Sequence, residues 1–181
     1  GGVLVSSFRS FVADEHSSVY PDVQPHGLTD CFGMTYNQFT EPGRTSIAGE
    51  KVRYFMELLK PETAEAKASY AHPYWGQYAG ITRNRCGAGA AWYVGCCTEK
   101  RLLKDVYRQA AADAGISMPS CEWPVTLRSS ETEDGRRLHF ILHYSQEERT
   151  IPCPFDHGTD ILTGKSYDRQ APIHLKDWDV V

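Results

Sequence analysis

The sequence lacks the features of a membrane protein, a nucleic-acid binder or a disordered chain. Its 181 residues contain no apolar run near the length of a membrane span. The formal net charge of −4 argues against nucleic acid or an anionic membrane as a partner. Apolar residues make up 41% and charged residues 23%, a balance that predicts a buried core. We therefore expect one large domain or two small ones.

The sequence also lacks the Cys-x-x-Cys spacing of many zinc and redox sites. Its six cysteines are Cys31, Cys86, Cys96, Cys97, Cys121 and Cys153. With no secretory signal and no small, loop-rich framework, this pattern favours buried, reduced thiols in a cytoplasmic protein over disulfides. The adjacent Cys96 and Cys97 are expected on opposite faces of a strand.

The centre of the chain predicts a β-hairpin. Residues 79–85 and 90–96 are rich in β-branched and aromatic side chains, and the glycines of residues 85–89 suit a turn. Before this hairpin, we expect strands at 3–8, 34–39 and 64–70, and a short helix at 28–32 that ends at Gly33. Residues 51–59 could form a strand or a helix, and we favour a strand. Within 51–59, the alternating residues Val52, Tyr54, Met56 and Leu58 should share one face.

A second helix is expected directly after the hairpin. Thr98 is the predicted N-cap and Gly115 the predicted C′ residue. One apolar face is formed by Leu102, Leu103, Val106, Ala110 and Ala114. Beyond a boundary near 116–120, short strand-like segments at 122–128, 137–144, 149–153, 161–162, 173–175 and 178–181 predict a small antiparallel β domain, a sandwich or partial barrel.

Residue patterns that suggest chemistry have simpler explanations here. His139 and His143 have the spacing of a helical zinc pair, but they alternate with apolar residues on a predicted strand, where they stand about 13 Å apart. Asp14-Glu15-His16 reads as a solvated or hydrogen-bonded loop, because a retaining glycosidase brings its two carboxyls together from distant strands. The glycines 87 and 89 lack the helix and Lys-Ser/Thr pair of a phosphate loop.

Several motifs together resemble one enzyme family. The segment ITRNRCGAGAAWYVG at 81–95 resembles a segment of the glycoside hydrolase family 42 β-galactosidases that lies in their trimerisation domain. Residues 1–15 (GGVLVSSFRSFVADE), 28–33 (LTDCFG), 140–145 (FILHYS) and 160–164 (DILTG) resemble further motifs of that family in the same order. The resemblance covers nearly the whole chain.

This resemblance implies a fold and a role. Residues 1–118 would be the later part of the trimerisation domain, an α/β flavodoxin-like (glutamine amidotransferase-like) layer that is incomplete at its N-terminus. Residues 119–181 would be the small all-β antiparallel C-terminal domain. The parent would be a cytoplasmic, homotrimeric β-galactosidase that hydrolyses terminal β-D-galactosyl residues. Its partners would be the catalytic barrel of the same parent and other copies of the chain, with no nucleic acid and no membrane.

The resemblance assigns no catalytic, cofactor-binding or metal-binding residue to this stretch, because the family's two glutamates belong to the barrel. Cys86 does not fit an amidotransferase nucleophile, since its surroundings read as strand–turn–strand rather than a strand-to-helix elbow. Two other functions remain open. One is a carbohydrate-binding module that uses Trp75, Trp92, Trp123, Trp178 and the ten tyrosines, although packing at a subunit interface is the favoured role for the cluster at 70–78. The other is an independent hydrolase or amidotransferase.

The start of the sequence suggests a piece of a larger protein. It has no initiator methionine and opens directly on the apolar residues 3–8. In the family this point lies inside the sheet, so the resemblance implies a first strand whose neighbours are missing. An unpaired, apolar strand favours association. We therefore predict that the chain self-associates through its first-domain surface, or is stable only beside the rest of its parent.

Overall fold

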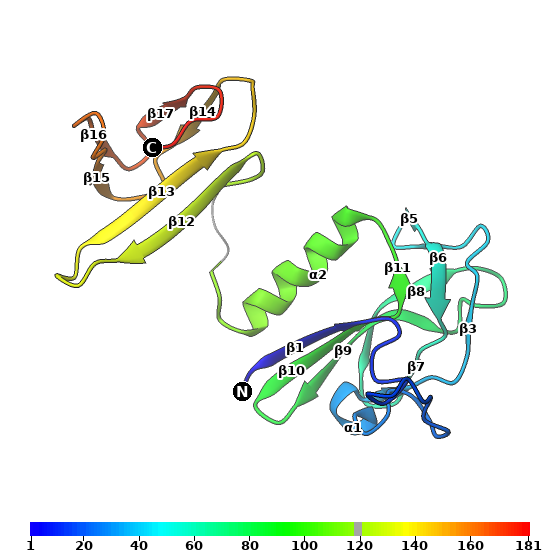
Figure 1. Ribbon diagram of the computed structural model, residues 1–181. Coiled ribbons are helices and arrows are strands. Elements are labelled where there is room, and N and C mark those ends of the chain that lie inside the picture. Colours follow the sequence, from blue (N-terminus) through cyan, green and yellow to red (C-terminus); the bar gives the residue numbers. More distant parts are fainter. Residues whose placement is uncertain (118–120) are drawn as a thin grey trace. The chain divides into compact units, whose positions relative to one another are not determined.

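The computed structural model describes residues 1–117 and 121–181, and Figure 1 shows their helices and strands. The chain divides into two compact units, residues 1–117 and residues 118–181. Part of the predicted boundary, residues 118–120, lies outside the described residues. Each unit has its own hydrophobic core and is described separately.

The first unit is built mainly from short strands. Its elements are β1 (Val3–Ser7), α1 (Thr29–Phe32), β2 (Met34–Thr35), β3 (Phe39–Thr40), β4 (Ser46–Ile47), β5 (Glu50–Lys51), β6 (Arg53–Glu57), β7 (Lys60–Pro61), β8 (Glu65–Ala71), β9 (Ala79–Cys86), β10 (Gly89–Val94), β11 (Cys96–Cys97) and α2 (Lys100–Asp113). A six-stranded sheet has the order β1-β10-β9-β8-β4-β5, and a three-stranded sheet has the order β11-β6-β3.

This architecture corrects the expected α/β flavodoxin-like layer of residues 1–118. The described structure is 43% strand and 10% helix, so the chain is mainly β. A flavodoxin-like layer needs parallel strands joined by crossover helices. Here only β1 pairs in parallel, with β10, and the other ladders of the six-stranded sheet are antiparallel. Turn-forming Gly and Pro residues leave no helical segment between residues 34 and 97.

The predicted central hairpin is confirmed. β9 and β10 pair antiparallel from Cys86–Gly89 to Ile81–Val94, and Gly87 takes the left-handed conformation that its turn position needs. β10 is buried on both faces because α2 packs on one face and α1 on the other. Its alternate residues therefore serve two different cores.

The first core lies between the sheet and α2. Trp92 and Val94 of β10 pack there with Leu102, Val106 and Ala110, the buried residues of α2. The opposite face of β10 carries Ala91 and Tyr93, which pack with Phe32, Met34, Tyr36 and Leu59 in the second core. Three residues of the predicted helical face are therefore buried. Of the other two, Leu103 is only partly buried and Ala114 is exposed.

The ends of both helices were predicted closely. α1 ends at Gly33, whose φ of +60° is left-handed, and Asn84 of β9 donates hydrogen bonds to the carbonyls of Asp30 and Cys31 at the end of this helix. α2 is followed by Gly115 with φ +68°, as expected for a C′ residue. The predicted N-cap Thr98 is wrong by one residue, because Glu99 occupies that position.

A bulge in β6 changes the face of one predicted strand residue. Cys96 pairs with Met56, and the next residue, Cys97, pairs with Arg53. The two residues of β6 between these pairs therefore have no partner in β11 and form the bulge. Tyr54 sits in this bulge with φ +58° and is 81% exposed, whereas Val52, Met56 and Leu58 are buried. Tyr54 therefore does not share the face of the other three.

The second unit consists of antiparallel pairs. Its strands are β12 (Val125–Glu131), β13 (Arg137–His143), β14 (Arg149–Pro152), β15 (His157–Thr159), β16 (Ser166–Asp168) and β17 (Pro172–Leu175). They pair as β12–β13, β14–β17 and β15–β16 around a core that includes Val125, Ile141, Ile151 and Ile173. The predicted strand at 161–162 is wrong, because Ile161 and Leu162 lie exposed in the turn between β15 and β16.

Candidate assembly site

The sequence Asp14-Glu15-His16 forms a turn. Asp14 Oδ1 accepts hydrogen bonds from the backbone N–H groups of His16 at 2.9 Å and Ser18 at 2.8 Å. Glu15 and His16 are exposed and reach one another at 3.9 Å. The carboxylate of Asp14 therefore stabilises its own loop, as the sequence suggested.

His139 and His143 both lie on β13, in separate environments. His139 Nδ1 is 2.7 Å from Ser129 Oγ and its ring stacks on Phe155. Burial, with help from Arg137, lowers the pKa of His139. His143 is buried, and its Nδ1 is 2.6 Å from the carbonyl oxygen of Lys176. In the described parts of the chain, no group of three or more His, Cys, Asp or Glu side chains is arranged to hold a metal ion.

All six cysteines are free thiols. Cys86 lies at the end of β9 before a strand-to-strand turn, as expected, so it has no nucleophile elbow. A thiol–thiol interaction with Cys86, together with burial, raises the pKa of Cys31 to about 11. Burial raises the pKa of Cys96 to about 12. These two thiols stay protonated near neutral pH, which disfavours them as nucleophiles.

The four tryptophans do not form one stacking platform. Trp92 is buried and donates its indole N–H to Asp113 at 2.8 Å, while Trp75 packs against the first core beside His72. In the second unit, Trp123 is exposed and stacks on Tyr144, and Trp178 is exposed. Tyr70, Trp75 and Tyr78 pack in the core of the first unit, whereas the predicted place of residues 70–78 at a subunit interface stays a prediction.

The most unusual titratable group was missed by sequence reasoning. Glu57, the last residue of β6, is only 1% exposed. One carboxylate oxygen, Oε1, accepts the backbone N–H of Arg9 at 2.7 Å, whereas Oε2 is buried with no hydrogen-bond partner among the described residues. Burial raises the pKa of the Glu57 carboxyl to about 7, against the opposing effect of the Arg9 N–H and the nearby Tyr93 and Tyr36 hydroxyls.

Glu57 connects the core to the loop that follows β1. Arg9 and Phe11 in this loop have φ values of +62° and +60°, which residues other than Gly rarely adopt. The hydrogen bond from Arg9 to Glu57 fixes the first of them. Around the carboxyl, Tyr93 donates its hydroxyl to Tyr36 at 3.2 Å. A glutamate within a hydrophobic stretch (Phe-Met-Glu-Leu-Leu, residues 55–59) is the only sequence signal for this site.

An ion pair joins α2 to the sheet. Arg83 of β9 donates two hydrogen bonds of 2.8 Å to Asp113 at the end of α2, in a bidentate arrangement. Asp113 also accepts the Trp92 indole N–H. The hydrogen bonds from Arg83 are the main cause of the lowered pKa of Asp113. Together these contacts fasten α2 over one face of the hairpin.

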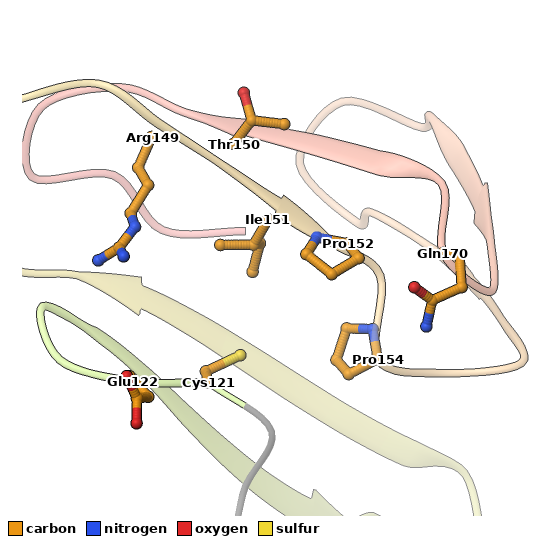
Figure 2. Close-up of a pocket in the computed structure, with 8 residues that line it drawn as sticks. All are labelled: Cys121, Glu122, Arg149, Thr150, Ile151, Pro152, Pro154 and Gln170. Atoms are coloured by element: carbon orange, nitrogen blue, oxygen red, sulfur yellow. The ribbon is translucent and has the colours of Figure 1, made fainter.

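A pocket in the second unit offers no reactive arrangement. Its volume is about 290 Å³. Figure 2 shows its lining, which consists of Cys121, Glu122, Arg149, Thr150, Ile151, Pro152, Pro154 and Gln170. Prolines and Ile151 form much of its wall, and it contains one carboxylate, so it has no pair of acids for glycoside hydrolysis.

No helix in residues 1–117 or 121–181 has both the length and the apolar character needed to cross a membrane.

Comparison with known proteins identifies the relatives of this chain. It is 29% identical, over 99% of its length, to β-galactosidase LacA of Lactobacillus acidophilus, and 25% identical over 90% of its length to β-galactosidase BgaA of a Planococcus species. It spans only 28% and 26% of the length of these two relatives.

Solved structures share the fold of the whole chain. The β-galactosidase from Bacillus circulans sp. alkalophilus matches 99% of the chain with a TM-score of 0.85 and 22% identity, and 28% of that protein is covered. The cold-adapted β-galactosidase from Rahnella sp. R3 matches 100% of the chain with a TM-score of 0.84 and 19% identity, again with 28% of that protein covered. The model of the beta-galactosidase trimerisation domain matches residues 1–117, the first unit. The chain therefore belongs to the β-galactosidase trimerisation domain family of glycoside hydrolase family 42.

Proposed function

We propose that this chain is the assembly region of a larger, cytoplasmic β-galactosidase that hydrolyses terminal β-D-galactosyl residues. Residues 1–118 would hold three subunits together and brace the catalytic barrel, and residues 119–181 would form the small C-terminal domain of the same parent. The observation that carries the proposal is the match of residues 1–117 to the trimerisation domain family.

Three further observations support a scaffold rather than a catalyst. The chain spans about a quarter of its β-galactosidase relatives, so most of such a protein lies elsewhere. In the described residues, the one deeply buried carboxyl, Glu57, bonds to backbone and lies among tyrosines rather than beside a second acid in a pocket. Asp14 stabilises a turn, and the neighbouring Glu15 is exposed. A glycosidase needs two carboxyls facing one sugar.

Two measurements on the purified chain test this proposal. Sedimentation should show reversible association toward three times the 20.3 kDa chain mass, with no release of nitrophenol from a nitrophenyl β-galactoside. Association follows from the assembly role, and the lack of turnover follows from the missing carboxyl pair. Turnover that disappears in Asp14→Ala or Glu15→Ala would contradict the scaffold role. A (β/α)-barrel with two strand-end glutamates in the upstream gene sequence would identify the parent's activity.

A further inference from the structure

An aromatic surface of the first unit is not explained by its own packing. The aromatic face consists of Phe8, Arg9, Phe39 and Phe55, and Tyr54 directly precedes Phe55 in β6. Phe55 lies at its centre, with ring-centroid distances of 5.5 Å to Phe8 and 5.1 Å to Phe39. The Arg9 guanidinium lies 5.9 Å from the Phe55 ring centroid, in cation–π range. Phe39 is 67% exposed and Tyr54 is 81% exposed.

The backbone beneath this face is strained. Tyr54 has φ +58° and Arg9 has φ +62°, and a left-handed conformation is a genuine outlier for a bulky residue such as Tyr. The bulge of β6 places Tyr54 at the surface, where its ring gains little from burial in a single chain. Strain of this kind persists where the surrounding structure enforces it, commonly at functional surfaces.

The face is held in place from the core. Glu57 follows Phe55 by two residues, pairs with Phe39 across the β6–β3 ladder, and accepts the N–H of Arg9. Glu57 therefore contacts the other two segments that carry the face, because its carboxylate binds the Arg9 N–H and its backbone pairs with β3. β3 is one of the two edge strands of its sheet, and in Figure 1 it lies on the opposite side of the first unit from α2. An edge with rings beside it suits association with another chain.

We propose that the aromatic face is a contact surface between copies of this chain, an inference that rests on the assembly role proposed above. The face lies wholly within residues 1–117, the part that matches the trimerisation family. Aromatic residues and arginine are the types enriched at the centres of protein interfaces. The chain carries 23 acidic against 19 basic residues, so a neighbouring copy offers carboxylates to Arg9.

Closed three-fold assembly also sets the kind of contact. In a ring of three copies each interface is heterologous, so the aromatic face meets a different surface of its neighbour. A variant that lacks the face still presents the other surface. Such a variant should therefore bind to the aromatic face of a wild-type copy through its other surface, but it cannot bind a further copy through its own face. Adding it to the wild-type chain should lower the mean mass of the assemblies.

Tyr54→Gly separates association from stability. Glycine adopts φ +58° without strain, so this variant should melt about 2–4 °C higher, while loss of the ring should weaken association at least about tenfold. Phe39→Ser should weaken association to a similar degree. Tyr107→Ala is the matched control, because Tyr107 is 57% exposed on α2, away from the face. It should leave association unchanged.

Sedimentation equilibrium of the 181-residue chain at micromolar concentrations measures these effects, with a melting curve for each variant. Wild-type association that is weakened by Tyr54→Gly and Phe39→Ser, but not by Tyr107→Ala, supports the inference. If the wild type associates and both face variants associate equally well, the inference is wrong and the assembly role stands. A wild-type chain that stays strictly monomeric contradicts both.

Discussion

The buried carboxyl of Glu57 predicts an unusual dependence of stability on pH. Its pKa in the folded chain is about 7, against the ordinary value of 4.5. Because the folded state holds the proton more tightly, the stabilising effect of protonation is complete below about pH 4.5. It is lost as the pH rises toward 7. At 1.36 kcal/mol per pKa unit, ionised Glu57 costs the fold about 3 kcal/mol above pH 7. Between pH 5 and pH 8 the change amounts to about 2–3 kcal/mol.

Glu57→Gln isolates this effect. The Gln side chain keeps an oxygen for the Arg9 N–H and cannot ionise, so the pH dependence that Glu57 adds should vanish. The new amide group has its own burial cost, but that cost is the same at both pH values. The difference in unfolding free energy, variant minus wild type, should therefore be about 2–3 kcal/mol larger at pH 8 than at pH 5, so that the variant gains relative stability as the pH rises.

Hydrogen exchange of peptides from β9 and β10, followed through urea unfolding, reports the first unit alone. Glu62→Gln is the control, since Glu62 is exposed and accepts a hydrogen bond from the Thr35 hydroxyl at 3.2 Å. It should give the same change in unfolding free energy at both pH values. An equal response of Glu57→Gln at pH 5 and pH 8 would refute the argument that burial controls this carboxyl.

Three further predictions concern the first unit and the thiols. Gly33→Ala should destabilise the chain by about 2–4 kcal/mol in urea unfolding, because φ is +60° and a Cβ would lie 2.4 Å from a side-chain atom of Thr63; Gly43→Ala, with φ +56° and open space, should cost less. Asp113→Asn should cost about 1 kcal/mol by loss of the Arg83 pair, a contribution present above pH 3.8 and lost as the pH falls. Intact mass measurement should show no disulfide mass deficit and no bound metal, whereas a stoichiometric zinc ion would contradict the prediction.

Local signals in the sequence were reliable where two independent features agreed. The hairpin of β9 and β10 combines strand-forming residues with glycines at the turn, and its register leaves Gly87 in the conformation that excludes most side chains. The helix α2 combines an apolar face with Gly115 at its end. Both elements are determined by residues close together in the chain, so a single sequence is enough to predict them.

The expected flavodoxin-like layer came from the family resemblance and not from the pattern of residues 1–118. Only residues 100–113 form a helix longer than one turn among the described residues, and a doubly wound layer needs several such helices. The short segments between Met34 and Ala71 alternate and turn too often for helices. The observed antiparallel ladders are what those segments themselves favour.

Glu57 and Tyr54 were missed for one common reason. Alternation along residues 51–59 places Tyr54 on the buried face together with Met56, and it places Glu57 on the exposed face. This is the arrangement that burial preferences favour for an aromatic ring and a carboxylate. The bulge exposes the ring, and the residues after it bury the acid. A bulge depends on the partner strand, β11, which is 39 or more residues away in sequence, so no local pattern reveals it.

A buried Glu57 and an exposed Tyr54 are both unfavourable for an isolated chain. Burying Glu57 costs free energy at neutral pH, and exposing Tyr54 in a left-handed conformation forfeits the gain that burial of its ring would bring. Local rules of sequence and structure are broken mainly where another requirement outweighs them. A contact between copies would cover the exposed ring, and the Arg9 bond would keep the face rigid before contact, which reduces the ordering cost of association.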